Sequence, residues 1–173
     1  MIENSKKGAA VYSRLNNAPT RDTVKIGLIY VEHGQDTQQQ LFHNSAGSSH
    51  YNEFVGSLAW TVTLKEHIGY VGGLSAVDGT TAPYYATPTM EVIFHDITRM
   101  PTKESDEQQI AKKKHVGNDW VHIIWSEHDR DYKTDVITSQ FNAAHVIVYP
   151  LPNGLYRVEV SQKDTTVIIF IYR

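Results

Sequence analysis

Short runs of apolar and β-branched residues recur along the chain, and polar residues, glycine or proline separate them. Runs of this length and composition are typical of β-strands in a packed sheet. The predicted strands are residues 24–31, 60–64, 84–87, 90–98, 120–125, 136–138, 144–149, 155–160 and 166–171, and residues 70–74 are predicted to be a strand end with a glycine turn. The pattern therefore predicts a strand-rich fold.

Helical patterns are fewer and shorter. Residues 36–42 and 48–58 each begin with a candidate N-cap, and the second segment carries apolar side chains along one helical face. Residues 104–116 combine helix formers with acidic groups early and lysines late, and Gly117 follows as a C-terminal stop. The predicted fold class is α/β, a single domain with a central mixed β-sheet flanked by a few helices.

Length and composition limit what this domain does. With 173 residues and 40% hydrophobic content, the chain has one sizeable core, which we assign to residues 24–173 behind a polar N-terminal arm of residues 1–23. The formal net charge of −3 gives no overall attraction to nucleic acid or to an anionic membrane. There is no cysteine, and no apolar run reaches the roughly 20 residues that cross a bilayer. We expect a cytoplasmic protein with no membrane insertion and no nucleic-acid partner.

Several kinds of active site lack the residues that they need. The glycines at 69, 72 and 73 precede neither a Lys-Ser/Thr pair nor a helix start, so the chain has no phosphate-binding loop of its own. A serine hydrolase of the α/β type needs a Gly-x-Ser-x-Gly elbow, which this sequence does not contain. The nine histidines fall in no recognised zinc motif, and we predict no metal site.

The most informative segment is a basic run, Lys112 to Lys114, which leads through His115 and Gly117 to Asn118 at the start of an apolar strand. A carboxamide both donates and accepts hydrogen bonds without titrating, so Asn118 could align a water molecule beside a phosphate. Asn118 could equally cap the turn after Gly117, and the lysines could equally form a solvated helix face. The chemistry of the residues alone leaves these alternatives open.

Residues 113–119, Lys-Lys-His-Val-Gly-Asn-Asp, resemble the Lys-Lys-Arg-His-Ile/Leu-Gly-Asn-Asp signature of the Rap/Ral/tuberin class of GTPase-activating proteins. The asparagine of that signature is the family's catalytic thumb. Further matches follow in the family's order at residues 25–31, 34–35, 51–55, 72–74, 91–95, 100–101 and 139–142. Residues 82–87 and 125–132 look closest to the catalytic subunit of Ral GTPase-activating complexes.

The resemblance implies that Asn118 is the catalytic residue, inserted into a partner GTPase to position the attacking water. The implied partner is a Ras-superfamily small GTPase of the Ral, Rap or Rheb type. That partner carries the GTP and the magnesium, so the chain needs no cofactor of its own. The neighbouring residues are expected to bind the GTPase or to support the thumb. They are Lys112, Lys113, Lys114, His115, Gly117 and Asp119.

Some of these implied roles are specific. Lys112 and Lys113 would steer the chain toward an acidic face of the GTPase. His115 and Lys114 would shape the catalytic helix and contact the GTPase, and Asp119 would support the loop by accepting backbone hydrogen bonds. Lys114 stands where the family usually has arginine. Lysine keeps the charge but loses the bidentate fork, so we expect weaker binding rather than lost chemistry.

Two hypotheses compete at this point. The first is a GTPase-activating domain, and the second is a non-catalytic module that binds a GTPase or assembles a larger complex. A non-catalytic regulatory subunit is a further candidate partner. The family's domains continue beyond the strand near residues 155–162, whereas here the apolar residues 167–171 lead to Arg173. We expect this apolar segment to be buried or paired, because an exposed edge invites aggregation.

Overall fold

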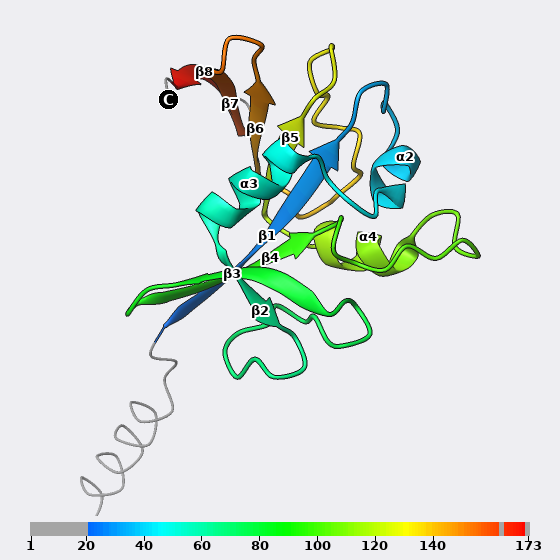
Figure 1. Ribbon diagram of the computed structural model, residues 1–173, viewed down its shortest axis with the longest axis vertical. Coiled ribbons are helices and arrows are strands. Elements are labelled where there is room, and N and C mark those ends of the chain that lie inside the picture. The colour runs from blue at the N-terminus through cyan, green and yellow to red at the C-terminus, as the bar shows by residue number, and fades with distance from the viewer. Residues whose placement is uncertain (1–20, 163–164, 172–173) are drawn as a thin grey trace, which may run out of the picture.

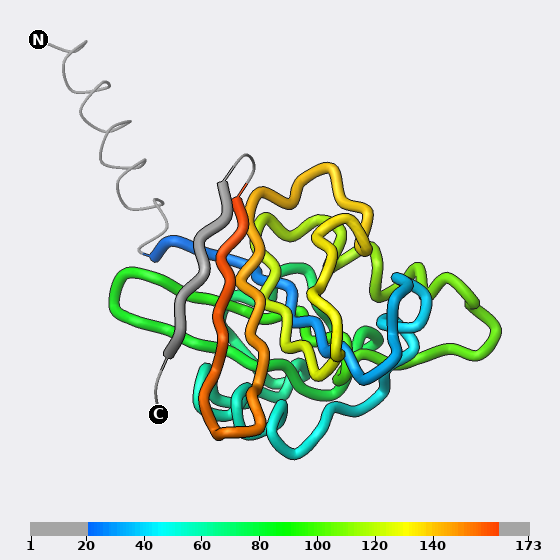
Figure 2. Tube along the Cα trace, turned by 90° about the horizontal axis from the view of Figure 1, so that it is seen from above, coloured from blue at the N-terminus to red at the C-terminus, as the bar shows by residue number. Residues whose placement is uncertain are grey.

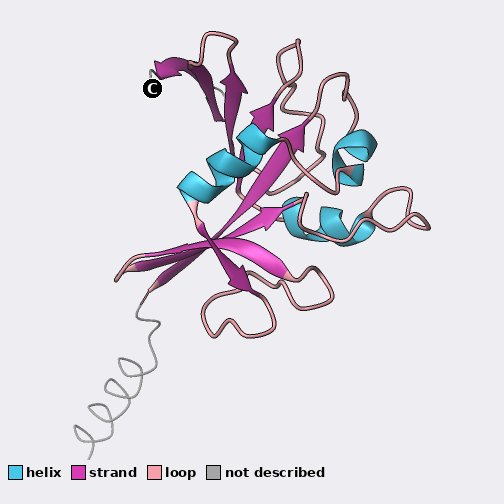
Figure 3. Ribbon diagram, viewed as in Figure 1, coloured by secondary structure: helices cyan, strands magenta, loops and turns pink. Residues whose placement is uncertain are grey.

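The computed structural model describes residues 21–162 and 165–171, the last of these segments by its backbone alone. An eight-stranded mixed sheet forms the centre, with the strand order β2-β3-β4-β1-β5-β6-β7-β8 (Figure 1, Figure 3). The strands are β1 Asp22–Val31, β2 Trp60–Thr63, β3 Thr81–Ala86, β4 Met90–Asp96, β5 Val121–Ser126, β6 Ala144–Pro150, β7 Tyr156–Gln162 and β8 Thr165–Ile171. The predicted α/β class with a mixed sheet is confirmed.

The centre of the sheet is parallel and both edges are antiparallel. β1 pairs in parallel with β4 on one side and with β5 on the other, and β5 pairs in parallel with β6. Antiparallel pairing adds β3 and β2 at one edge and β7 and β8 at the other. Seen from above, β6 and β7 run side by side in orange and red (Figure 2). The apolar C-terminal segment is paired as expected, with Ile171 of β8 opposite Tyr156 of β7.

Helices pack on both faces of this sheet. α2 (Gln38–His43) and α3 (Ser49–Leu58) follow β1, and α4 (Ile110–Val116) precedes β5 (Figure 1). Thr37 and Ser48 cap α2 and α3, because each side-chain oxygen accepts the backbone N–H of the residue three positions later. Every helix within the described ranges is too short or too polar to cross a membrane.

The alternation of side chains along β1 divides the core into two layers. Leu28 and Tyr30 pack against α3 on one face, and Ile29 and Val31 pack with α2 and α4 on the other. Leu28 and Ile29 are both 0% exposed, so the central strand is buried on both faces. Burying side chains of this size stabilises a fold by about 1.5–3 kcal/mol each. The central strands are therefore a rigid platform for whatever lies on them.

One predicted strand and one predicted strand end are wrong. Residues 70–74 lie in the long connection between β2 and β3 and contain no strand, but the predicted glycine turn is present, with left-handed φ values of 60° and 90° at Gly72 and Gly73. A Cβ on Gly72 would lie 2.4 Å from Cγ2 of Ile93, so this glycine lets the connection lie against β4. Residues 136–138 form a bend in which Ile137 packs into the core beside α2 and α4. A short apolar run can anchor a loop as well as build a strand.

The predicted helix over residues 104–116 is wrong in its first half. α4 begins only at Ile110, because Gln109 takes the left-handed conformation with φ 47° and ψ 49°. Gln109 is 1% exposed. Its Oε1 accepts the backbone N–H of Lys103, and its Nε2 donates to the carbonyls of Lys103 and Asp106. The Asp106 carboxylate accepts the N–H of Ile110 at 2.7 Å. The acidic residues thus lie before the helix rather than in its first turn.

Candidate functional site

The end of α4 presents Asn118 to solvent. A tight turn follows the helix, in which the N–H of Asn118 donates to the carbonyl of His115 at 3.0 Å and that of Asp119 to Val116 at 3.1 Å. The side-chain Nδ2 of Asn118 donates to the carbonyl of Lys114 at 2.6 Å. Only the NH₂ group of the amide can donate to a carbonyl, so this contact assigns Nδ2 to the side facing the helix and leaves Oδ1 on the other side. Among the described residues Oδ1 has no hydrogen-bond partner, and Asn118 is exposed. One carboxamide therefore caps the helix and offers a free acceptor.

Gly117 ends α4 for a steric reason. Its φ of −65° is right-handed, which any residue can adopt. A Cβ at this position would, however, lie 2.7 Å from the carbonyl oxygen of Lys113, which accepts the N–H of Gly117 at 2.8 Å. A larger residue would open this last turn and move Asn118. The helix stop predicted at Gly117 is confirmed, and the close approach to Lys113 explains why a glycine stands there.

Lys112 lies inside the protein, so the predicted steering role for this residue is wrong. Its side chain is 0% exposed, and Nζ donates to the carbonyl of Asn44 at 2.8 Å and to Oγ1 of Thr102 at 2.7 Å. Burial lowers the pKa of Lys112 to about 8, although the nearby Asp96 charge acts in the opposite direction. A buried ammonium group that already donates to Asn44 and Thr102 cannot contact an acidic group of a partner. It ties α4 to the segments that follow α2 and β4.

His115 and Lys114 share one carboxylate, Asp78 of the β2–β3 connection. His115 Nε2 lies 3.0 Å and Lys114 Nζ lies 3.2 Å from Asp78 Oδ1, while Ser75 donates two hydrogen bonds to Oδ2. Burial raises the pKa of Asp78, but hydrogen bonds from Ser75, His115 and Lys114 outweigh it and hold the pKa well below its ordinary value. Burial lowers the pKa of His115, although the bond to Asp78 acts against this. Asp78 is thus an anion that fixes the last turn of α4.

Asp119 is fully buried, and its carboxylate contacts side chains rather than the backbone donors that we expected. Oδ2 lies 2.7 Å from Nδ1 of His95 on β4, and Oδ1 lies 3.7 Å from Nζ of Lys25 on β1. The side chains of Asp119 and His95 are both 0% exposed. The expectation fails because the N–H groups of residues 117–119 already donate to carbonyls of α4, which leaves none for this carboxylate.

The register of the sheet leaves room for this turn. Gly27 of β1 lies between His95 of β4 and His122 of β5. A Cβ on Gly27 would lie 2.8 Å from Cδ2 of His122, 3.2 Å from Cγ1 of Val116 and 3.4 Å from Oδ2 of Asp119. His122 Nε2 lies 2.9 Å from the carbonyl oxygen of Val116. The end of α4 therefore rests directly on the strands, with a histidine holding it on each side.

A loop holds the other side of the turn. Ser139 Oγ donates to the carbonyl of Gly117 at 2.7 Å, and the N–H of Ala143 donates to the carbonyl of Trp120 at 2.8 Å. Ser139 Oγ also accepts the backbone N–H of Asn142 at 3.0 Å, which keeps the loop compact. Both ends of the segment that carries Asn118 are therefore fixed from the β5–β6 connection.

The side chains that remain outward near Asn118 are basic and aromatic. The side chain of Lys114 is 55% exposed, and Lys113 is half-buried and forms no ion pair within residues 21–162. Trp120 is 69% exposed, although the apolar pattern predicted it as the first residue of a buried strand. β5 begins only at Val121, so Trp120 lies outside the paired part of the sheet. Of the predicted site residues, Lys113, Lys114 and Asn118 are accessible to a partner.

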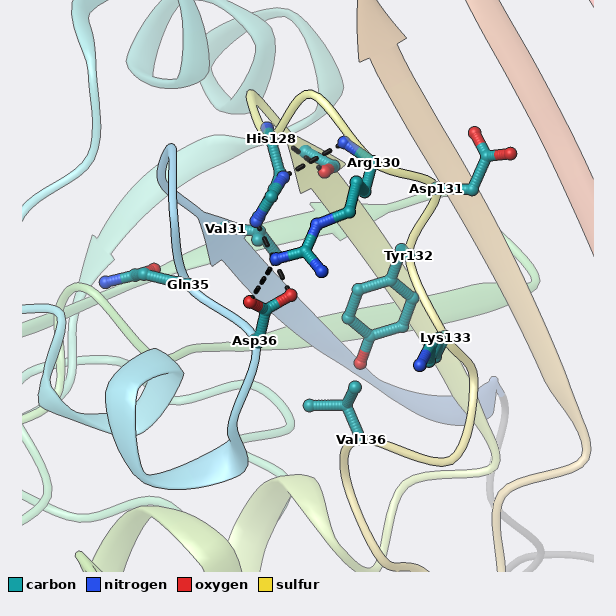
Figure 4. Close-up of a pocket in the computed structure, with 10 residues that line it drawn as sticks. Val31, Gln35, Asp36, His128, Arg130, Asp131, Tyr132, Lys133 and Val136 are labelled. Atoms are coloured by element: carbon teal, nitrogen blue, oxygen red, sulfur yellow. Dashed lines mark hydrogen bonds and ion pairs between the residues drawn. The ribbon is translucent and has the colours of Figure 1, made fainter.

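A separate cavity of about 240 Å³ lies at the opposite, carboxyl ends of the strands (Figure 4). Val31 and Ser126, the last residues of β1 and β5, line it together with charged loop residues. Asp36 pairs there with Arg130 and lies 3.5 Å from Nε2 of His128 (Figure 4). The residues that line this cavity include none of the predicted site residues. The turn after α4 is therefore the candidate site.

The sequence did not identify Asp78 and His95 as part of this arrangement. His95 lies in an apolar strand, and a polar side chain in that setting is a signal that a buried partner must accompany it. Asp78 lies in the β2–β3 connection, and it carries no such signal because its partner on α4, His115, lies 37 residues away.

Comparisons with known proteins agree with this geometry. Residues 41–171 match the family model described as Rap/ran-GAP. The structure is similar to the solved structure of the TSC2 GAP domain, with a TM-score of 0.80 and 30% identity over 86% of this chain and 87% of that chain. The chain belongs to the Rap/ran-GAP family, and its fold is that of the TSC2 GAP domain.

Longer proteins contain similar segments. The chain is 43% identical to the Drosophila melanogaster "Probable Rho GTPase-activating protein CG5521" over 94% of this chain and 8% of that protein. It is 40% identical to mouse Ral GTPase-activating protein subunit alpha-2, over 94% of this chain and 9% of that protein. It is 39% identical to the human subunit alpha-1, over 94% of this chain and 8% of that protein. The chain thus spans less than a tenth of the length of these curated relatives.

Proposed function

We propose that this chain stimulates GTP hydrolysis by a Ras-superfamily small GTPase and supplies Asn118 as a catalytic thumb. The observation that carries the proposal is the state of the Asn118 carboxamide. Nδ2 is held by the carbonyl of Lys114 at 2.6 Å, and the exposed Oδ1 is free to accept a hydrogen bond from outside the described chain. Membership of the Rap/ran-GAP family supports the class of activity. The GTPase contributes the GTP and the magnesium.

The chemistry asks for placement rather than for a reactive group. Phosphoryl transfer to water gains most from positioning the nucleophile in line with the γ-phosphate and from stabilising charge. Oδ1 of Asn118 would accept one proton of the attacking water in a hydrogen bond, which directs a lone pair of the water oxygen toward phosphorus. The bond from Nδ2 to Lys114 restricts rotation of the carboxamide before the GTPase binds. Less conformational entropy is then lost in the complex.

The residues around Asn118 suit an encounter with another protein. Lys113 and Lys114 provide positive charge beside it, and exposed charges of this kind speed association with an acidic surface at low salt. Trp120, 69% exposed, offers a large rigid contact area two residues away in the sequence. We assign these three side chains to the docking of the GTPase and Asn118 to the chemistry.

The names of the relatives differ in the GTPase that they mention, Rho in one case and Ral in others. We propose a GTPase of the Ral type as the first substrate to test, with Rap, Rheb and Rho types beside it. The human and mouse relatives are named as subunits, so a non-catalytic regulatory subunit is a further proposed partner. A cytoplasmic setting belongs to the same proposal.

Single-turnover GTP hydrolysis tests this function. Each of the four GTPase types is loaded with GTP, and the chain is added in increasing amounts with and without a candidate regulatory subunit. We expect acceleration of one type that saturates with the concentration of the chain. A chain that binds one of these GTPases tightly but accelerates none would be the non-catalytic binding module instead.

A further inference from the structure

We propose that Asp78 and His95 are positioning residues for Asn118. Neither side chain is on the turn that carries the thumb, and each acts through a neighbour of Asn118 that it holds. His95 on β4 binds Asp119, the residue after the thumb, and Asp78 in the β2–β3 connection binds His115, three residues before it. The inference rests on the proposed function and adds two residues to it.

Both contacts are buried and short. His95 Nδ1 lies 2.7 Å from Asp119 Oδ2, with both side chains 0% exposed. His115 Nε2 lies 3.0 Å from Asp78 Oδ1, with side chains 8% and 7% exposed. Charge-assisted hydrogen bonds between buried groups are stronger and more directional than bonds at the surface. The turn is therefore held at one point on each side of Asn118.

The two pairs also touch each other. The imidazole rings of His95 and His115 lie edge to face, with centroids 5.2 Å apart and an interplanar angle of 62°. A displacement of one ring is therefore transmitted to the other pair. His95 itself cannot shift easily, because β4 pairs with β1 on one side and with β3 on the other. The backbone at Gly72 also lies close to the ring, since a Cβ added to Gly72 would lie 3.0 Å from Nε2 of His95. The four residues form one rigid support that joins α4 to the sheet.

The support matters for the direction of the thumb rather than for its chemistry. The bond from Asn118 to Lys114 lies within α4 and its turn, so it fixes the carboxamide only relative to the helix. Loss of His95 would leave the buried Asp119 carboxylate with Lys25 at 3.7 Å as its remaining ionic partner. A poorly paired buried charge moves toward water when it can, and here it would move the adjacent Asn118 with it. A shift of about 1 Å in a positioning group costs roughly 100-fold in rate.

Two substitutions at His95 separate a positioning role from a packing role. His95→Asn keeps an N–H donor at about the place of Nδ1, whereas His95→Leu fills similar volume without a donor. Tyr51→Phe is the matched control, because it removes a buried hydrogen bond of 2.8 Å to Asp96, the next residue of β4, on the face that packs against α3. Asp78→Asn is the second test variant, since it keeps the acceptor for Ser75 but loses the charge that faces His115.

The readouts are the maximal stimulated rate of GTP hydrolysis, the concentration of the chain that gives half of this rate, and the melting temperature. For His95→Leu we expect the maximal rate to fall about 100-fold while the half-saturating concentration changes by less than about threefold. Asp78→Asn should lower the maximal rate in the same way, and His95→Asn should recover most of it. Neither His95→Leu nor Asp78→Asn should have any further effect in a chain that already carries Asn118→Ala.

Several results would overturn the inference. One is that Asp78→Asn and His95→Leu stimulate hydrolysis at the same maximal rate as the control Tyr51→Phe, which would mean that they act only through the loss of a buried contact. Another is a change confined to the half-saturating concentration. If His95→Leu does not fold, Asp78→Asn and His95→Asn decide the question. If the unaltered chain accelerates no GTPase, the proposed function has failed before the positioning residues are tested, so the two failures are distinguishable.

Discussion

Lys112 makes the stability of this fold depend on pH in a direction that can be worked out from the structure. Its ammonium group is 0% exposed, and burial lowers its pKa from 10.5 to about 8. The unfolded chain keeps the ordinary value, so between these two pKa values the unfolded state binds more protons than the folded state. The free energy of unfolding must then rise with pH across this window. Below it, the fold bears the full cost of a buried cation.

The size of the effect follows from the same two values. The two pKa values differ by about 2.5, and a difference of one corresponds to about 1.36 kcal/mol. Complete deprotonation of Lys112 therefore raises the free energy of unfolding by about 3.4 kcal/mol relative to the fully protonated state. Most of this rise in the free energy of unfolding, about 2–3 kcal/mol, occurs between pH 7 and pH 10. The neutral amine still donates to the carbonyl of Asn44 and to Thr102, so both hydrogen bonds survive the loss of the proton.

Urea unfolding at several pH values measures this directly. Methionine in Lys112→Met has a side chain of similar length without a charge. Subtracting the unfolding free energy of this variant from that of the unaltered chain removes the contributions of the other titrating groups, because both proteins share them. We expect the difference to shift by about 2–3 kcal/mol in favour of the unaltered chain from pH 7 to pH 10. Lys113→Met on the same helix controls for the loss of a lysine. A difference for Lys112→Met that stays constant with pH would refute the reasoning.

Three further substitutions test the packing beneath the turn and the surface around it. Gly27→Ala places a methyl group 2.8 Å from His122, so we expect urea unfolding to show a loss of about 1–3 kcal/mol, and an unchanged midpoint would contradict the close approach. Ile124→Ala, at a position 0% exposed, should cost about 2–5 kcal/mol in the same assay; a loss below that range would mean that the core collapses around the gap. Trp120→Ala should raise the half-saturating concentration of the chain about tenfold with no change in maximal rate, and unaltered binding would remove Trp120 from the docking surface.

The long apolar runs predicted the sheet well because a strand buried on both faces has few alternatives. Residues 24–31 and 144–149 became β1 and β6 with small changes at their ends. The two failures were short segments in which local geometry or burial satisfied the same pattern. Residues 70–74 contain two left-handed glycines, and residues 136–138 bury Ile137 without joining the sheet. The glycine turn can be read from the sequence, but the burial of Ile137 outside the sheet cannot be read from the apolar pattern alone.

The candidate site divides in the same way. The position of Asn118 after a helix and a glycine stop depends on neighbours in sequence, so the sequence could predict it. The partners of His115 and Asp119 lie 37 and 24 residues away and are brought there by the sheet and its connections. The burial of Lys112 beside the more accessible Lys113 and Lys114 depends on which side of α4 meets the protein. The sequence therefore located the turn that carries Asn118 but not the residues that hold it.

The most direct test of the central claim is the maximal stimulated rate of single-turnover GTP hydrolysis by the Asn118→Ala variant. Asn52→Ala on α3 is the matched control, because Asn52 is also exposed and its Nδ2 also donates to a backbone carbonyl, that of Gly47 at 3.2 Å. We predict a loss of at least about 100-fold for Asn118→Ala at a saturating concentration of the variant chain and none for Asn52→Ala, with both variants folded and able to bind. Full stimulation by Asn118→Ala would contradict the account.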